Sequence, residues 1–177
     1  MKIARPNPDE YASHLQKYID LVKDDEPVKG LLASRKEVVK LISGLSKKEL
    51  KFRYEEGKWS IKEMLLHMMD TERVFAFRAL QFSRNDKNEL PGFEENEWAP
   101  ASKADARKVK SLLKEYDAIR EASIQLYSNL TDEMFLCTGI ASKKLMSVRA
   151  LLYVTLGHER HHLNVIKERY LNKSKSK

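Results

Sequence analysis

Cysteine is almost absent from this chain, since Cys137 is the only one among 177 residues. One cysteine cannot form an internal disulfide, so small disulfide-stapled folds are excluded and a cytoplasmic location is expected. Long apolar runs are absent too, and none approaches the roughly 18 residues of a membrane-spanning helix. Residues 1–6 lack the apolar stretch and cleavage site of an export signal. We therefore expect a cytoplasmic protein with no membrane segment.

Glycine and proline are scarce as well, with six and five copies. With few exceptions, Gly157 among them, they fall between segments in which apolar residues recur at helical spacing. No segment alternates convincingly with a period of two, so strands are not expected. The sequence predicts an all-α fold, a four-helix bundle with short extra helices in the connections. The length fits one domain over residues 1–177, with a core at about 8–171 and a frayed basic tail at 172–177.

Capping residues, glycine and proline mark where the helices begin and end. The clearest start is the segment 60–63, a capping box in which the Ser60 hydroxyl and the Glu63 carboxylate each bind a free backbone N–H. Pro27 and Gly44 bound another helix at its start and end. The predicted helices cover residues 8–22, 27–42, 46–52, 61–83, 102–130, a short piece from 131, and 147–171, with a long loop at 85–101.

The net charge of +7 is unevenly distributed. Residues 29–53 carry eight basic side chains against two acidic ones, and residues 86–97 carry five acidic side chains against one basic one. A basic surface can attract nucleic acid or an anionic metabolite. The simpler interpretation is a solvated helix face. Because no nucleic-acid-binding motif accompanies the basic stretch, nucleic acid is the least favoured partner and a small molecule is preferred.

Three of the five histidines lie in the segment His158-Glu159-Arg160-His161-His162. Residues four apart on a helix project from the same face, so His158 and His162 can reach one ion. His161 lies further round toward solvent, although pairing His158 with His161 stays open. Gly157 inside this helix costs about 1 kcal/mol relative to alanine, which makes sense if another backbone or a ligand approaches there.

His67 is the best candidate for a third metal ligand, at the edge of the apolar stripe of its helix. Glu63 and Asp70 lie nearby, where either carboxylate could orient the imidazole. Three neutral imidazoles with an open fourth position describe a catalytic type of zinc site, and nickel, iron or manganese also fit. The alternative is that the histidine pair arises by chance and that His67 is a satisfied residue at the core boundary.

Three groups of motifs, taken in their order along the chain, resemble those of a known family. They are Gly57-Lys58-Trp59-Ser60-Ile61-Lys62-Glu63 with His67, Asp70, Glu72 and Arg73, then Leu90-Pro91-Gly92-Phe93 with Trp98, and finally Gly157-His158-Glu159-Arg160-His161-His162-Leu163. From about residue 28 to 170 the chain resembles the DinB-like superfamily. That resemblance implies an up-down-down-up four-helix bundle and one divalent metal ion, held by the residues at His67, His158 and His162.

The function that this resemblance implies is less uniform. Relatives include transferases that use low-molecular-weight thiols such as bacillithiol or mycothiol, and the sequence looks closest to the bacillithiol transferase branch. We therefore expect a metal-dependent transferase in which the ion, most simply zinc or nickel, activates such a thiol for attack on an electrophile. A metal-dependent hydrolase and a non-catalytic metal- or ligand-binding stress protein remain alternatives. Relatives often form homodimers.

Further residues have both a structural and a functional interpretation. Phe93 and Trp98 are expected either to line a pocket or simply to pack the long loop onto the bundle. Arg78 lies two to three turns beyond His67 and could bind a carboxylate of a ligand, or be a solvated or ion-paired arginine. Glu159 is expected to orient a metal ligand or to form a salt bridge. Cys137 is expected to be a small buried apolar residue rather than a nucleophile.

Overall fold

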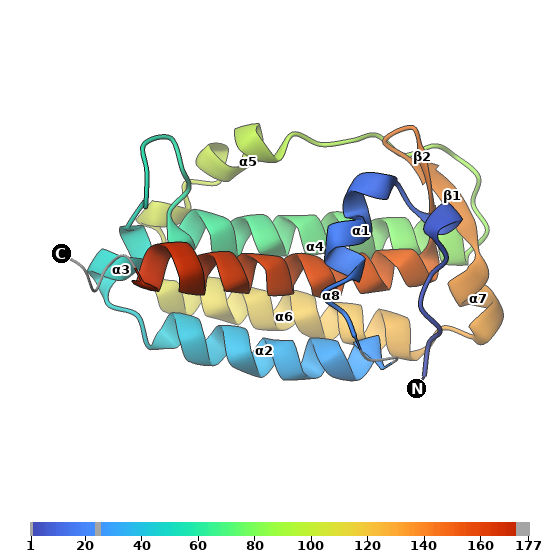
Figure 1. Ribbon diagram of the computed structural model, residues 1–177, viewed down its shortest axis with the longest axis horizontal. Helices are drawn as coiled ribbons and strands as arrows, with labels where there is room; N and C mark the ends of the chain where they lie inside the picture. Colours follow the sequence, from blue (N-terminus) through green and yellow to red (C-terminus); the bar gives the residue numbers. More distant parts are fainter. Residues whose placement is uncertain (1, 24–25, 173–177) are drawn as a thin grey trace.

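The computed structural model describes residues 2–23 and 26–172. Four long helices lie side by side (Figure 1): α2 (Pro27–Ser43), α4 (Ile61–Ser83), α6 (Val109–Ser128) and α8 (Val148–Val165), the last continued by the π-helical turn η4 (Ile166–Leu171). In Figure 1, α2 and α8 run in one direction and α4 and α6 in the other. This confirms the predicted all-α four-helix bundle with its up-down-down-up order. The tail at 173–177 and the predicted helix break at 24–25 lie outside the described residues.

The helix starts are held by the predicted capping side chains. Ser60 Oγ accepts a hydrogen bond from the Glu63 N–H at 3.1 Å, and the Ser60 N–H donates to the Glu63 carboxylate at 2.8 Å. Ser147 caps α8 by accepting from the Ala150 N–H. The short helices α3 (Lys47–Lys51) and α7 (Asp132–Leu136) begin after Ser46 and Thr131 in the same manner. Because a cap satisfies donors that the helix itself leaves free, local sequence fixes these boundaries.

The N-terminal segment differs from its prediction as one helix over residues 8–22. It forms short pieces instead: η1 (Pro8–Glu10), η2 (Ser13–Leu15) and α1 (Gln16–Ile19). Contacts with α8 account for the difference, because the Glu10 carboxylate accepts hydrogen bonds from Ser147 Oγ and Arg149 Nε, both at 2.7 Å. The segment follows the surface of the bundle, and this tertiary anchoring outweighs its helical pattern.

The connection from α4 to α6 is long because these two helices run in parallel. The loop predicted at 85–101 in fact contains a helix, α5 (Glu95–Ala101), which packs against α4. A single turn, η3 (Ala104–Ala106), precedes α6. Pro100, near the end of α5, is consistent with so short a helix.

A β-hairpin corrects the expectation that the chain has no strands. Strands β1 (Thr138–Ala141) and β2 (Lys144–Ser147) pair in antiparallel fashion, and the β1 backbone also bonds to Leu90. Ser142 and Lys143 form the turn with φ values of +53° and +60°, as a type I′ hairpin turn requires. Strands of four residues are too short to show a recognisable period, so the hairpin escaped sequence analysis.

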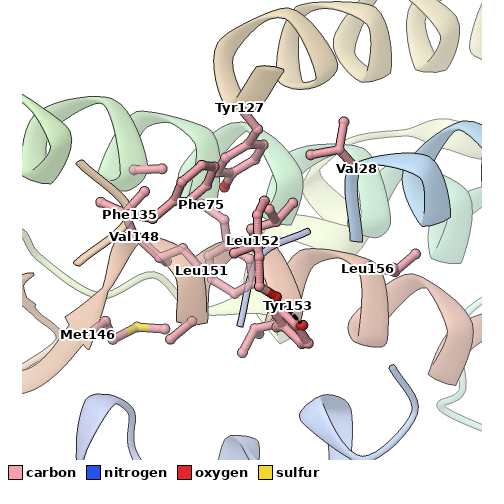
Figure 2. Packing of buried hydrophobic residues seen from close by; sticks show 14 of the residues in the cluster. Val28, Phe75, Tyr127, Phe135, Met146, Val148, Leu151, Leu152, Tyr153 and Leu156 are labelled. Carbon is pink, nitrogen blue, oxygen red and sulfur yellow. Dashed lines mark hydrogen bonds between the residues drawn. The ribbon is translucent and has the colours of Figure 1, made fainter. Parts of the chain in front are cut away.

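Two apolar clusters fill the bundle. One surrounds the first half of α8 and includes Phe75, Tyr127 and Leu152 (Figure 2). The other surrounds the second half of α8 and includes Met69 and Leu163. No helix in the described part of the chain is long and apolar enough to cross a membrane.

Candidate metal centre

The side chains of His67 on α4 and of His158 and His162 on α8 meet between these two helices. The Nε2 atom of His158 lies 3.0 Å from Nε2 of His67 and 3.0 Å from Nε2 of His162. One nitrogen from each of the three rings lies within 4.8 Å of the others. Because 91 residues separate His67 from His158, the packing of α4 against α8 creates this cluster.

Burial keeps these imidazoles neutral. It lowers the pKa of His67 from 6.5 to about 4, an effect that the negative charge of Glu95 only partly opposes. Burial also lowers the pKa values of His158 and His162, and the neighbouring imidazoles and Lys17 lower them further. Protonation of one ring disfavours protonation of the next, so all three present lone pairs at neutral pH.

This donor set fits a divalent metal ion. Nitrogens bound tetrahedrally to zinc at about 2.0–2.1 Å lie roughly 3.3 Å apart, close to the 3.0 Å that separates Nε2 of His158 from Nε2 of each of the other two histidines. The three nitrogens that face one another cannot all be paired by hydrogen bonds among themselves, because a neutral imidazole carries only one N–H. No carboxylate or thiol in the described part of the chain joins the three histidines in the cluster.

Aromatic rings hold the imidazoles in place. The Trp59 ring lies 4.7 Å from the His67 ring, between centroids, and the Tyr18 ring meets the His158 ring edge-on at 5.3 Å. Phe75 approaches His158 from a third side. These contacts restrict the rotation of the rings that carry the nitrogens.

A cavity of about 480 Å³ opens over the three histidines. Its walls come from the N-terminal segment, α4, α5 and the β-hairpin. Apolar side chains make up much of the lining, and four charged side chains also belong to it: Lys17, Arg78, Glu95 and Lys144. A small molecule of this size can therefore reach the face that the three nitrogens leave open.

A family model described as the DinB superfamily matches residues 31–166, which is more than half of the chain. This chain belongs to the DinB superfamily. A protein of Oceanobacillus iheyensis named "Putative metal-dependent hydrolase" is 26% identical over 137 residues, which cover 76% of this chain and 78% of that protein. One of Geobacillus thermodenitrificans with the same name is 24% identical over 123 residues, covering 68% and 69%.

The bundle also resembles a solved structure. YfiT from Bacillus subtilis, described as a probable metal-dependent hydrolase with an unusual four-helix bundle topology, superimposes with a TM-score of 0.70 at 17% identity. The likeness covers 97% of this chain and 94% of YfiT. At this identity the likeness shows a shared four-helix bundle fold.

The carboxylates expected to orient the imidazoles bind elsewhere. The Asp70 carboxylate accepts a hydrogen bond from Arg73 at 3.0 Å, and that of Glu63 is engaged by Arg53 and by the capping N–H of Ser60. Both point toward neighbouring arginines instead of an imidazole, which corrects the expectation. His162 Nδ1 is buried and has no hydrogen-bond partner among the described residues.

Glu159 forms a salt bridge, the second of its two expected roles. Its carboxylate accepts from Arg120 at 2.6 Å and from the Tyr116 hydroxyl at 2.8 Å. Arg120 also donates to both oxygens of Glu72 at 2.9 and 2.8 Å. We call these four side chains the buried charge network. It carries a formal net charge of −1. Its Tyr116 belongs to the second apolar cluster, and its Arg120 donates to the carbonyl of Leu31, a member of the first.

The predicted pocket residues divide between two cavities. Phe93 and Arg78 line the cavity over the histidines and also an adjacent, mostly apolar cavity of about 430 Å³. Trp98 lines only the adjacent one, where its ring lies 4.9 Å from that of Phe93. Arg78 is neither solvated nor ion-paired, which corrects both structural interpretations: it is 5% exposed and has no carboxylate partner among the described residues.

Sequence analysis missed several residues around the centre. Lys17 and Tyr18 were assigned to a helix without a role, and Ser142 and Lys144 belong to the unpredicted hairpin. The aromatic neighbours of the histidines carry no spacing signal of their own. Gly157 was the one sequence signal for this region: a glycine inside the helix predicted that a backbone or ligand approaches there, and the backbone of Tyr18 does so. Cys137 packs at the edge of an apolar cluster but is only half-buried, which is less than expected.

Proposed function

We propose that this chain is a metal-dependent enzyme in which the Nε2 atoms of His67, His158 and His162 bind one divalent ion. One observation carries the proposal: three neutral imidazole nitrogens converge at the floor of a cavity with no fourth protein ligand among the described residues. A site that lacks a fourth protein ligand is of the catalytic kind, with a position for substrate. Zinc or nickel suits the three imidazoles, and iron or manganese is compatible with them.

The proposed nucleophile is a low-molecular-weight thiol, which attacks an electrophile held in the same cavity. A bound divalent ion stabilises the deprotonated form of a thiol or water, supplying a nucleophile at neutral pH. A thiol starts from a pKa of about 8.5, against 15.7 for water, so it needs less help from a base. That difference suits a cluster of three histidines with no carboxylate among them. Lys17, Lys144 and Arg78 favour an anionic thiol.

Hydrolysis is the second candidate function, because two relatives are named as metal-dependent hydrolases. Glu95 lines the cavity, and its charge acts on His67. It is the carboxylate placed to accept a proton from water in such a reaction.

Metal analysis of the purified protein tests the ligands. We expect close to one equivalent of divalent ion per chain in the wild type and in His161→Ala, and a loss of most of it in His158→Ala. His161 is the matched control because it lies on the same turn of α8 but contributes no nitrogen to the cluster. Full metal occupancy in His158→Ala would refute the assignment.

An activity assay then separates the two reactions. The metal-loaded protein is mixed with monochlorobimane and either bacillithiol, mycothiol, glutathione or coenzyme A, and conjugate fluorescence is followed. We expect conjugation with at least one thiol, at a rate proportional to metal content. Ester or amide hydrolysis without conjugation would favour the hydrolase, and a Glu95→Gln variant should then lose most of that hydrolysis.

A further inference from the structure

Arg78 is a buried cation without an anion. Its Nη2 donates to the Pro91 carbonyl at 3.0 Å and to Ser142 Oγ at 3.2 Å, both neutral acceptors. Within the described part of the chain, its other guanidinium nitrogens have no hydrogen-bond partner. Burial lowers the pKa of Arg78, and no carboxylate offsets the effect. Arginine nevertheless remains protonated at any physiological pH.

Arg120 shows that this fold can compensate a buried arginine. Arg120 is 1% exposed, and two carboxylates, from Glu72 and Glu159, neutralise its charge. Arg78 is 5% exposed, but the residues that contact its guanidinium, Phe75, Pro91 and Ser142, supply no negative charge. The carboxylates that line the two cavities, Glu95 and Asp70, form no ion pair with it. Because an unpaired buried charge is costly, a charge kept in a substrate cavity points to a partner that arrives with the substrate.

The structure also fixes how the guanidinium is presented. Arg78 lies on α4, and the segment around Pro91 and the hairpin turn at Ser142 hold one of its nitrogens from two sides. Arg78 lines the cavity that contains the three histidines and also the adjacent apolar cavity, and its remaining donors have no hydrogen-bond partner among the described residues. A planar guanidinium with free donors binds a carboxylate through two parallel hydrogen bonds. One cation with neutral neighbours matches a singly charged carboxylate better than a phosphate, which needs more donors.

We propose that Arg78 binds a carboxylate of the substrate and thereby selects elongated, acid-bearing molecules for reaction at the three histidines. This inference rests on the proposed function, because it assumes that the reacting group lies at the histidines. His67 and Arg78 are eleven residues apart on one helix, so their Cα atoms are about 16 Å apart along its axis. A ligand that reaches both must therefore separate its carboxylate from its reacting group.

Thiols of graded length test this proposal by binding alone. The protein is loaded with cobalt(II), whose sulfur-to-cobalt charge-transfer band reports a bound thiol. The probes are ω-mercaptoalkanoates of three, six, eight and eleven carbons, each compared with the mercapto-alcohol of the same length. In the wild type we expect no advantage of the acid at the shortest length. At a longer one we expect roughly tenfold tighter binding of the acid, as a charge-assisted pair provides.

Substitutions assign the effect to one side chain. Arg78→Met should abolish the preference for the acid while leaving alcohol binding and cobalt content unchanged, and Arg78→Lys should retain part of it. Arg84→Met is the matched control, because Arg84 ends the same helix but is exposed and lies outside both cavities.

The possible failures are distinguishable. An absent acid preference at every length in the wild type would overturn the role of Arg78, as would a preference that survives in Arg78→Met. If Arg78→Met does not fold, Arg78→Lys decides the matter, because an acid preference equal to that of the wild type in this variant would also overturn the role of Arg78. Failure of cobalt to bind, or of any thiol to produce the band, would instead refute the proposed metal centre.

Discussion

The backbone carbonyl of Tyr18 lies directly against Gly157. A β-carbon built on Gly157 would come within 2.0 Å of the Tyr18 carbonyl oxygen. The ring of the same tyrosine packs edge-on against His158, the next residue of α8. The glycine therefore lets the N-terminal segment close over the turn of α8 that carries the candidate ligands.

Gly157→Ala should destabilise the protein by about 1–3 kcal/mol. Overpacking against a backbone outweighs the gain of about 1 kcal/mol that alanine brings to a helix interior. Urea unfolding followed by circular dichroism measures the change. Gly44→Ala is the control, because its nearest contact is an ordinary 3.4 Å and its effect should be small. Equal stability of the Gly157 variant and the wild type would mean that the segment can move aside without cost.

The metal-free protein should lose stability as the pH falls from about 6.5 to about 4. Folding lowers the pKa of His67 from 6.5 to about 4, so within this range the unfolded chain binds more protons and acid favours unfolding. His67 alone accounts for up to about 3 kcal/mol. Burial opposes ionisation of Glu10, but hydrogen bonds from Arg149, Asn7 and Ser147 outweigh it and lower the pKa of Glu10 from 4.5 to about 2, so Glu10 adds to the loss mainly below about pH 4.5.

Urea titrations at several pH values between 7 and 4.5 measure this dependence. A metal-free His67→Asn variant should show a shallower slope than the wild type. A stability that stays flat across this range in the metal-free wild type would contradict the prediction.

Removing the only cation of the buried charge network should strongly destabilise the protein. In Arg120→Met the carboxylates of Glu72 and Glu159 remain buried without their partner, which we expect to cost about 3–5 kcal/mol. Arg35→Met is the comparison: it breaks a more exposed pair of contacts, to Asp117 and Glu121, and should cost less than about 1 kcal/mol. Similar losses for the two variants in urea would show that the network contributes no more than a surface pair.

Lys143→Gly should stabilise the hairpin by about 0.5–1 kcal/mol. Lys143 adopts a φ of +60°, which glycine tolerates better than any residue with a β-carbon. Thermal unfolding should show a higher midpoint for this variant. Lys144→Gly, one residue later and outside the positive-φ turn, should lower it. A gain in both variants, or in neither, would point to an origin other than the turn.

Local signals made the bundle predictable. Capping residues such as Ser60 and Ser147 act within their own first turn, so the sequence reveals them. The N-terminal segment and the hairpin depend on distant partners, such as Arg149 for Glu10 and Leu90 for β1. No local pattern carries that information, and both were predicted wrongly.

In the candidate site, too, some features were predictable from the sequence and others were not. His158 and His162 share a helix face, so their spacing predicted that they would meet, and His67 followed from its place on the apolar stripe. Asp70 and Glu63 lie close to His67 in sequence, but their hydrogen bonds go to Arg73 and Arg53. Arg73 lies three residues beyond Asp70 on the same helix, and Arg53 lies in the connection between α3 and α4. Several groups lie within reach of each carboxylate, and sequence spacing alone did not choose among them.

The positions of the three histidines in the chain also determine how early during protein synthesis the cluster can form. A nascent chain still attached to the ribosome contains His67 long before His158 and His162 have been made. The donors cannot meet until α8 has emerged and packed against α4. Under the proposed function, cofactor loading follows the synthesis of α8, and truncated products that end before α8 would lack the site.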